Sequence, residues 1–371
     1  MASTVLDTAA WAASEPLITA PLLYLLTRGP PHIRERILAP FQTNLLARNS
    51  VARVATLITV LKVLTSLGVV KRINAAMNSF ALNKWTLGRK GKEWKFGPRK
   101  EELILITGGS SGIGYEMVKG FSKDARVVVI DISPFPEELA KLSDVSFYRC
   151  DITDFDAVAD VCSQIRNRHG DPTVLINNAG IGSIGRSVLE STNESTEKLF
   201  KVNLLSHFVL IRELLPAMLR NRKGHIVTIA SMASFIAGAG LLDYCCSKVG
   251  ALYLSDGIRA ECLHRYPDGE SICTTSVHPS WHATGIIPES DFKKLQRRGV
   301  RVDPPSNVAD VVVEQVRRGR SGRLFVPRNQ AFLAGNRNWP LWVQDLVTGI
   351  WRGRQRNGFR FRGEEGAAVE G

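Results

Sequence analysis

The sequence predicts an α/β protein with a doubly wound parallel sheet of about seven strands and helices on both faces. Two observations predict this class. Short runs rich in Val, Ile and Leu alternate with segments long enough for crossover helices, as in parallel sheets buried on both faces. A glycine-rich turn follows the first run and leads into a helical pattern, as at the start of a βαβ unit. The expected strands span residues 103–107, 126–131, 145–151, 173–178, 224–231, 271–279 and 323–327.

Composition and charge divide the chain into three parts. Of 371 residues, 44% are hydrophobic and 22% are charged, which is ordinary for a folded protein. The formal net charge of +13 splits into +11 for residues 1–100, −5 for residues 101–316 and +7 for residues 317–371. An acidic central domain therefore carries two basic flanks. The six cysteines lack paired C-x-x-C spacing and lie in apolar segments, which indicates reduced, buried thiols and no metal site.

The first hundred residues are expected to form a hydrophobic, membrane-associating extension followed by a basic linker. Its two apolar segments, 9–26 and 51–70, are interrupted by Glu15, Arg53 and Lys62, so neither is a clean spanning helix. A shallow hairpin or a tilted anchor fits this pattern. The alternative is that these apolar residues form a dimer interface or a helical cap on a soluble domain.

The basic linker is expected to run from residue 71 to residue 100, where it would face anionic headgroups on the cytosolic side. Residues 101–327 form the expected catalytic domain, and residues 328–371 form a tail with an amphipathic segment and a disordered end. Trp339, Trp342 and Trp351 stand beside arginines in that tail. This composition suits a membrane surface, although the same tryptophans could instead cover the core of the catalytic domain.

The glycine-rich turn carries the first functional signal. Gly108, Gly112 and Gly114 lie between an expected strand and an expected helix, where backbone N–H groups can bind a pyrophosphate. Asp131 ends the second strand, in position to accept hydrogen bonds from ribose hydroxyls and to repel a 2′-phosphate. The sequence therefore favours NAD(H), and NADP(H) stays open.

A second signal is the pair Tyr244 and Lys248. If residues 241–263 form a helix, the phenol and the ammonium lie on one face. A positive charge nearby would lower the pKa of the phenol and make Tyr244 a usable proton donor and acceptor. A surface tyrosine beside a solvated lysine is the alternative for so short a motif.

Together with "NNAG" at 177–180, "KVNLLSHF" at 201–208 and "IVTIASMAS" at 226–234, these motifs closely resemble the short-chain dehydrogenase/reductase family. The resemblance covers residues 101–327 and implies a Rossmann-type fold. It also implies a catalytic tetrad. Tyr244 would be the acid/base, Lys248 would lower its pKa and bind the nicotinamide ribose, Ser231 would bind the substrate oxygen, and Asn203 would hold a water that links Lys248 to solvent.

The resemblance also implies a set of cofactor-binding residues. Asp151 matches the family's adenine contact and Thr284 its nicotinamide contact. Ser280 stands where the family has a glycine after the sixth strand, so the loop there is expected to differ. The full implied set is Gly108, Ser110, Ser111, Gly112, Ile113, Gly114, Asp131, Asp151, Ile152, Asn178, Ala179, Gly180, Tyr244, Lys248 and Thr284.

The apolar extension and the tryptophan-rich tail resemble one branch of this family, the lipid-droplet 17-beta-hydroxysteroid dehydrogenases and membrane retinol dehydrogenases. This implies an enzyme that interconverts an apolar alcohol and its carbonyl, a steroid, a retinoid or a long-chain lipid, at the endoplasmic reticulum or lipid droplets, with its catalytic domain in the cytosol. A catalytically weak, membrane-anchored scaffold is the alternative. No nucleic-acid partner is expected, because the basic flanks adjoin apolar segments, and a homodimer stays open.

Overall fold

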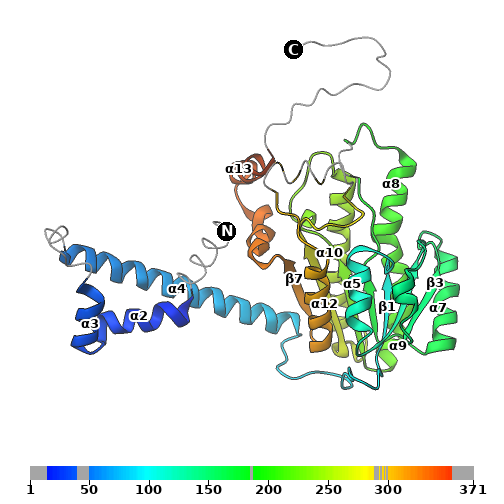
Figure 1. Ribbon diagram of the computed structural model, residues 1–371, viewed down its shortest axis with the longest axis horizontal. Coiled ribbons are helices and arrows are strands. Elements are labelled where there is room, and N and C mark those ends of the chain that lie inside the picture. The colour runs from blue at the N-terminus through cyan, green and yellow to red at the C-terminus, as the bar shows by residue number, and fades with distance from the viewer. Residues whose placement is uncertain are drawn as a thin grey trace, which may run out of the picture. The chain divides into compact units, whose positions relative to one another are not determined.

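The computed structural model describes residues 15–39, 50–183, 187–287, 292, 295, 297 and 300–352. The chain divides into two compact units, residues 1–85 and 86–371. Figure 1 shows the helices of the first unit and, in the second, a sheet with helices on both sides. The helices of the first unit are α2 (Pro16–Arg28), α3 (Pro31–Leu38) and α4 (Ser50–Leu82).

The second unit contains a parallel sheet of seven strands in the order β3-β2-β1-β4-β5-β6-β7. The strand order reverses between β1 and β4, which opens a crevice at the carboxyl ends of these strands. The predicted fold class is confirmed. The strands are β1 (Leu103–Thr107), β2 (Arg126–Asp131), β3 (Val145–Arg149), β4 (Val174–Asn177), β5 (Gly224–Ile229), β6 (Ile272–Pro279) and β7 (Gly322–Val326).

Two hydrophobic cores lie on opposite faces of the sheet, because successive strand residues point to opposite sides. Leu103 and Leu105 of β1 pack in one core, and Ile104 and Ile106 pack in the other. The first core is covered by α7 (Phe155–His169), α9 (Ser206–Arg220) and α10 (Leu242–His264), and the second by α5 (Gly112–Phe121), α6 (Glu137–Ala140) and α12 (Ser306–Arg318).

Shorter elements complete the unit. They are α8 (Asn193–Phe200), the π-helical turn η3 (Lys201–Leu205), the 3-10 turns η4 (Met232–Ser234), η5 (Gly269–Ser271) and η6 (Arg328–Asn338), and α13 (Leu341–Arg352).

Two of the predicted strands, β3 and β7, are less buried than expected, and β5 ends at Ile229, two residues before its predicted end. β3 and β7 are mostly half-buried, because they form the edges of the sheet. β3 also ends at Arg149, two residues before the predicted end, since the chain turns away there to begin the loop that contains Asp151. Cys246 is exposed and Cys273 is half-buried, so the prediction of buried thiols holds for only four of the six cysteines.

Part of the predicted basic linker is helical, and part is held against the sheet. Helix α4 continues to Leu82, because lysine and arginine are good helix formers and do not end a helix. Further on, the backbone N–H of Lys92 donates to the carbonyl of Arg222 at 3.0 Å, and Lys100 forms an ion pair with Asp144 at 2.7 Å. Residues 89–102 are therefore a strap along the edge where the strands begin, opposite the crevice.

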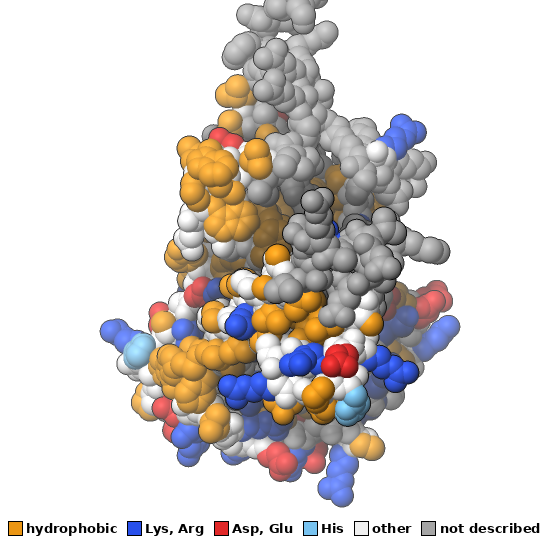
Figure 2. Space-filling model, turned by 90° about the vertical axis from the view of Figure 1, so that its left-hand side faces the viewer, with side chains coloured by type: hydrophobic (Ala, Val, Ile, Leu, Met, Phe, Trp, Pro, Cys, Tyr) orange, Lys and Arg blue, Asp and Glu red, His pale blue; other side chains and the backbone are white. Residues whose placement is uncertain are grey.

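The first unit has a small core of its own. Leu26, Leu38 and Leu61, one from each helix, are buried together. Two helical stretches, Ala52–Leu82 and Asn193–Arg220, are long and apolar enough to cross a membrane, by length and composition alone. In Asn193–Arg220, which belongs to the unit with the sheet, 56% of the most apolar window is buried. In Ala52–Leu82, only 11% of that window is buried. Figure 2 shows hydrophobic side chains exposed next to Lys and Arg side chains.

The tail after β7 is partly packed on the unit that contains the sheet and partly exposed. Leu333 and Trp339 pack against Phe235 and Leu252, so this part covers the catalytic unit. Trp342, on α13, is 70% exposed. The side chain of Trp351 lies outside the described residues.

Candidate active site

The predicted cofactor and catalytic residues collect at the carboxyl edge of the sheet, where parallel α/β proteins bind ligands. They come from six strand ends. Gly108 follows β1, Asp131 ends β2, Asp151 follows β3, Asn178 follows β4, Ser231 follows β5 and Thr284 lies in the loop after β6.

The turn after β1 has the geometry of a pyrophosphate cradle. Gly108 has a φ of +67°, and a Cβ there would lie 2.8 Å from the Cα of Ala179. A Cβ on Gly114 would lie 1.9 Å from the carbonyl oxygen of Gly108. Only glycine fits at these two positions. Ser111 begins α5 without a side-chain cap, and the buried Ser110 hydroxyl has no partner among the described residues, so donors are available for a phosphate.

The carboxylate of Asp131 is fixed beside this turn. It accepts hydrogen bonds from the backbone N–H groups of Ser110 and Ser133, both at 2.9 Å. One strand further out, the Asp151 carboxylate accepts from the backbone and the hydroxyl of Thr153. Ile152 beside it is buried. Both aspartates thus stand where the sequence predicted, at the ends of neighbouring strands.

The loop after β4 forms the opposite wall. The Asn178 amide donates to the carbonyls of Thr107 and Gly108, both at 2.9 Å. This amide therefore braces the glycine turn, a role that sequence reasoning missed. A Cβ on Gly180 would lie 3.4 Å from Oδ1 of Asn203 and 3.5 Å from Nζ of Lys248. Gly180 therefore brings the cofactor wall next to the predicted catalytic residues.

The loop after β6 closes the crevice from above the turn. A Cβ on Gly112 would lie 3.4 Å from the methyl group of Thr284, so Thr284 lies over the glycine turn as expected of a cofactor contact. Ser280 has no positive φ, and its backbone N–H donates to the carbonyl of Val326 at 2.8 Å. The serine therefore fits without the strain that its replacement of a glycine suggested.

Three of the four predicted tetrad residues converge directly. Tyr244 and Lys248 lie one turn apart on α10, as the spacing predicted. The Ser231 side chain acts on the Tyr244 phenol and lowers its pKa. The Lys248 ammonium lies 5.7 Å from the centre of the Tyr244 ring and donates to the carbonyl of Ile229 at 2.9 Å.

Burial dominates the electrostatics of this cluster. Burial raises the pKa of Tyr244 to about 12, and its hydrogen bond with Ser231 opposes this rise. Burial lowers the pKa of Lys248 to about 8. The pKa of the phenol is thus raised where the sequence predicted a lowered one, because the phenol is buried.

Asn203 reaches the cluster through an intermediate side chain. Its amide pairs with the backbone N–H and carbonyl of Ile181, at 2.9 and 3.0 Å, and donates to the Ser247 hydroxyl at 3.1 Å. Ser247 in turn donates to the carbonyl of Tyr244 at 2.8 Å. One acceptor site of Oδ1 remains for a water. Ser247 was not predicted, although its place in "YCCSK" could have drawn attention to it.

Two further features surround the cluster. Ser183 donates to the carboxylate of Asp243, which ties the loop after β4 to the start of α10.

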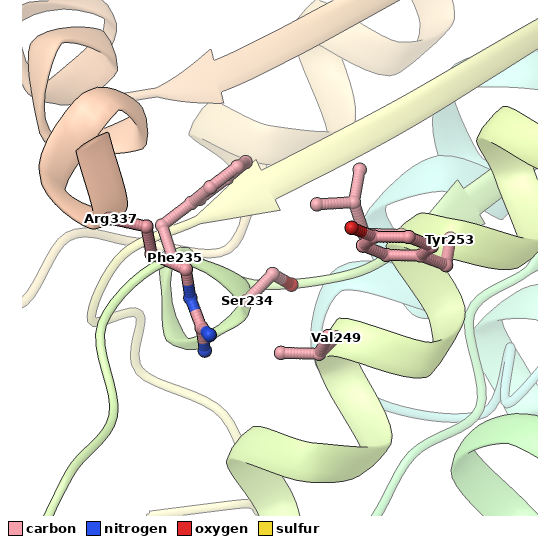
Figure 3. A pocket seen from close by; sticks show the side chains of 6 residues that line it. Ser234, Phe235, Val249, Tyr253 and Arg337 are labelled. Atoms are coloured by element: carbon pink, nitrogen blue, oxygen red, sulfur yellow. The ribbon is translucent and has the colours of Figure 1, made fainter.

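Beside α10 lies a hollow of about 420 Å³, lined by Ser234, Phe235, Val249, Leu252, Tyr253 and Arg337. Figure 3 shows these side chains coming from three separate parts of the chain. Within the described residues, no group of three or more His, Cys, Asp or Glu side chains could hold a metal ion.

Comparison with known proteins agrees with this geometry. The model of the short chain dehydrogenase family matches residues 102–291, more than half of the chain. The chain is 33% identical over 206 residues to "Dehydrogenase RED2" of Cochliobolus heterostrophus, covering 55% of this chain and 75% of the relative. It is 36% identical over 201 residues to "Epidermal retinol dehydrogenase 2" of Mus musculus, covering 51% of this chain and 64% of the relative.

A solved structure, "4-hydroxyisoleucine dehydrogenase complexed with NADH", has a TM-score of 0.55 and 23% identity, and covers 61% of this chain and 96% of its own. At that identity the likeness shows the fold. The chain belongs to the short-chain dehydrogenase family and is an oxidoreductase that acts on CH–OH groups with a nicotinamide cofactor.

Proposed function

We propose that this enzyme interconverts an apolar alcohol and its carbonyl compound, with Tyr244 as the acid/base and NAD(H) as the preferred cofactor. The observation that carries the proposal is the cluster of Ser231, Tyr244 and Lys248 beside Gly180, at the strand edge that holds the glycine turn. A scaffold without activity would have no need to place these three side chains together.

The chain's own residues supply binding and proton transfer, while a bound nicotinamide supplies hydride donation or acceptance. In the oxidation direction the Tyr244 oxygen takes the alcohol proton, and in reduction it returns that proton to the substrate oxygen. The Ser231 hydroxyl donates a hydrogen bond to the same oxygen. Lys248, charged below about pH 8, stabilises negative charge on the phenol as it forms.

Asp131 supports the preference for NAD(H). Its two hydrogen bonds from backbone N–H groups hold the carboxylate at the end of β2, where it can accept from ribose hydroxyls and repel a 2′-phosphate. Neither the glycine turn, residues 108–114, nor the residues directly after Asp131 supply a Lys or Arg to bind that phosphate.

The apolar character of the substrate rests on two supports. The relative from Mus musculus is named a retinol dehydrogenase. The apolar helix α4, of which little is buried, favours placement at a lipid surface. We extend this to a cytosol-facing site at the endoplasmic reticulum or lipid droplets, anchored by residues 1–85, with the catalytic unit in the cytosol.

The test is turnover by the purified full-length chain in detergent, with steroid, retinoid and long-chain fatty alcohols supplied one at a time. The proposal expects stoichiometric formation of NADH and carbonyl product with at least one apolar alcohol, and slower formation of NADPH. Product formation with water-soluble alcohols only would contradict the substrate class. Cofactor binding with no turnover on any alcohol or carbonyl would favour the scaffold alternative.

A further inference from the structure

His278, on β6, is a buried polar side chain beside the predicted catalytic residues. It is 0% exposed. Its ring packs against two phenylalanine rings, with centroids 4.9 Å from Phe235 and 5.2 Å from Phe325, and these two rings also contact each other. Both ring nitrogens of the imidazole have a polar partner.

Those partners define how the ring is protonated. Nδ1 lies 3.3 Å from the carbonyl oxygen of Ser231, and Nε2 lies 3.1 Å from the hydroxyl of Ser276. A carbonyl can only accept, so Nδ1 carries the hydrogen and Nε2 accepts from Ser276. Burial lowers the pKa of His278 to about 3, so the ring stays neutral throughout the working range.

Ser231 sits where the chain leaves the sheet after β5, and its conformation depends on a few local bonds. Its hydroxyl accepts from the backbone N–H of Ala233 at 3.1 Å. Its carbonyl accepts from the backbone N–H of Ser234 at 3.0 Å. Both of these bonds lie within the same turn, η4. The hydrogen bond from His278 links Ser231 to the neighbouring strand β6, although the two residues are 47 positions apart in the sequence.

We propose that His278 is a positioning residue for this reaction: its Nδ1–H holds the main chain of Ser231 so that the serine hydroxyl meets both Tyr244 and the substrate oxygen. This inference rests on the proposed function, since it takes Ser231 to be catalytic. Small misplacements of a catalytic group are costly, and about 1 Å can reduce a rate by about 10²-fold. The aromatic contacts of His278 with Phe235 and Phe325 help to hold the imidazole that makes this bond.

Three variants distinguish the role of the His278 hydrogen bonds in positioning Ser231 from the role of the His278 ring in filling the core. His278→Asn keeps an N–H donor close to the Nδ1 position and loses the contact to Ser276. His278→Gln keeps a polar group close to the Nε2 position and loses the donor to Ser231. His278→Phe keeps the aromatic packing and loses both hydrogen bonds.

The measurements are kcat, KM for the cofactor and KM for the alcohol, together with NADH affinity by fluorescence. We expect His278→Gln and His278→Phe to lower kcat by about tenfold or more, with unchanged NADH affinity, because the glycine turn is built from other strands. We expect His278→Asn to stay within about threefold of the parent. Equal losses in the Asn and Gln variants, or full activity in the Phe variant, would overturn the proposal.

Introducing His278→Gln into a Ser231→Ala background distinguishes a positioning role of His278 from a purely structural role. Since His278 acts through Ser231, His278→Gln should lower kcat little further there, whereas a purely structural loss would add to it. Full activity of Ser231→Ala alone would contradict the proposed function. An inactive Ser231→Ala with a fully active His278→Gln would contradict only the positioning role.

Discussion

Apolar residues behave differently in the two units of this chain. In the catalytic unit the apolar strand residues are covered by helices on both faces of the sheet. In α4 they are not, and Leu67, Val70 and Ile73 are 60%, 63% and 58% exposed. Exposed apolar surface of this extent marks a surface that associates with something else. A run of apolar residues therefore forms a core where the topology supplies a cover, and stays exposed where it does not.

The strap of residues 89–102 belongs with the covered region. Glu102 is fully buried, and it accepts from the Lys223 ammonium at 2.5 Å and from the Thr173 hydroxyl at 2.8 Å. Within the basic linker, Lys100 pairs with Asp144 at 2.7 Å, so the positive charges of that linker are partly structural. The boundary between the two regions lies between Trp85 and Thr86, three residues before the strap.

The largest expected effect comes from cutting at that boundary. A chain that begins at Thr86 keeps the strap and both cores of the sheet, so it should fold, bind NADH and stay soluble without detergent, while the full chain partitions into membranes. Fractionation with an NADH-binding assay measures both properties. A chain that begins at Leu103 removes the strap with Glu102 and should fail to fold. If the chain partitioned into membranes equally with and without residues 1–85, the first unit would not be the part that associates with membranes.

Breaking the buried ion pair of the strap should have the next largest effect. Glu102→Gln leaves the Lys223 ammonium, 13% exposed, without its countercharge, and loss of one partner of a buried pair typically costs about 3 kcal/mol or more. Urea unfolding of the chain that begins at Thr86 measures the loss. Glu101→Gln is the matched control, because its pair with Lys95 is at the surface and should barely move the midpoint. Equal shifts in the two variants would contradict the structural role of the strap.

Cofactor preference should change with Asp131. Replacing this carboxylate by arginine removes a like charge facing a 2′-phosphate and adds an opposite one, so the ratio of kcat/KM for NAD to that for NADP should fall about tenfold or more. Steady-state kinetics with both cofactors measure the ratio. Asp160→Arg, on the exposed side of α7, controls for the change in net charge. A parent enzyme that prefers NADPH would show that Asp131 has been misinterpreted.

The pH dependence should differ between the two directions. Burial raises the pKa of Tyr244 to about 12, so the neutral phenol is favoured at neutral pH. Alcohol oxidation needs the deprotonated oxygen and should speed up as the pH rises from about 7 to about 10, while carbonyl reduction, which needs the proton, should change little because the phenol stays protonated over this range. Initial rates of oxidation and of reduction, measured over this pH range, test the prediction. Oxidation that slows over the same range would contradict the assignment of the proton acceptor.

Local rules made part of the structure predictable. The glycine turn, the strand ends and the helix that carries Tyr244 and Lys248 follow from spacing and residue type within short segments. Gly108 was predictable in this sense, because a turn with positive φ beside a backbone requires glycine.

Contacts between distant segments could not be predicted in this way. The links from His278 to Ser231, from Asn203 to Ile181 and from Lys223 to Glu102 depend on which strands become neighbours. The sign of the Tyr244 pKa shift was also predicted wrongly. Spacing places Lys248 on the same helix face as Tyr244, but it does not show that the phenol is buried deeply enough to raise its pKa.

The most direct test of the account is the turnover of Tyr244→Phe in the full-length enzyme. The change removes one oxygen atom and keeps the ring, so NADH should still bind while kcat falls by about 10² to 10⁴, the usual range for general acid–base catalysis. Tyr253→Phe is the matched control, since this tyrosine lies on the same helix and is 73% exposed, and it should keep full activity. Turnover of Tyr244→Phe within about twofold of the parent, in either direction of the reaction, would contradict the assignment of Tyr244 as the proton carrier.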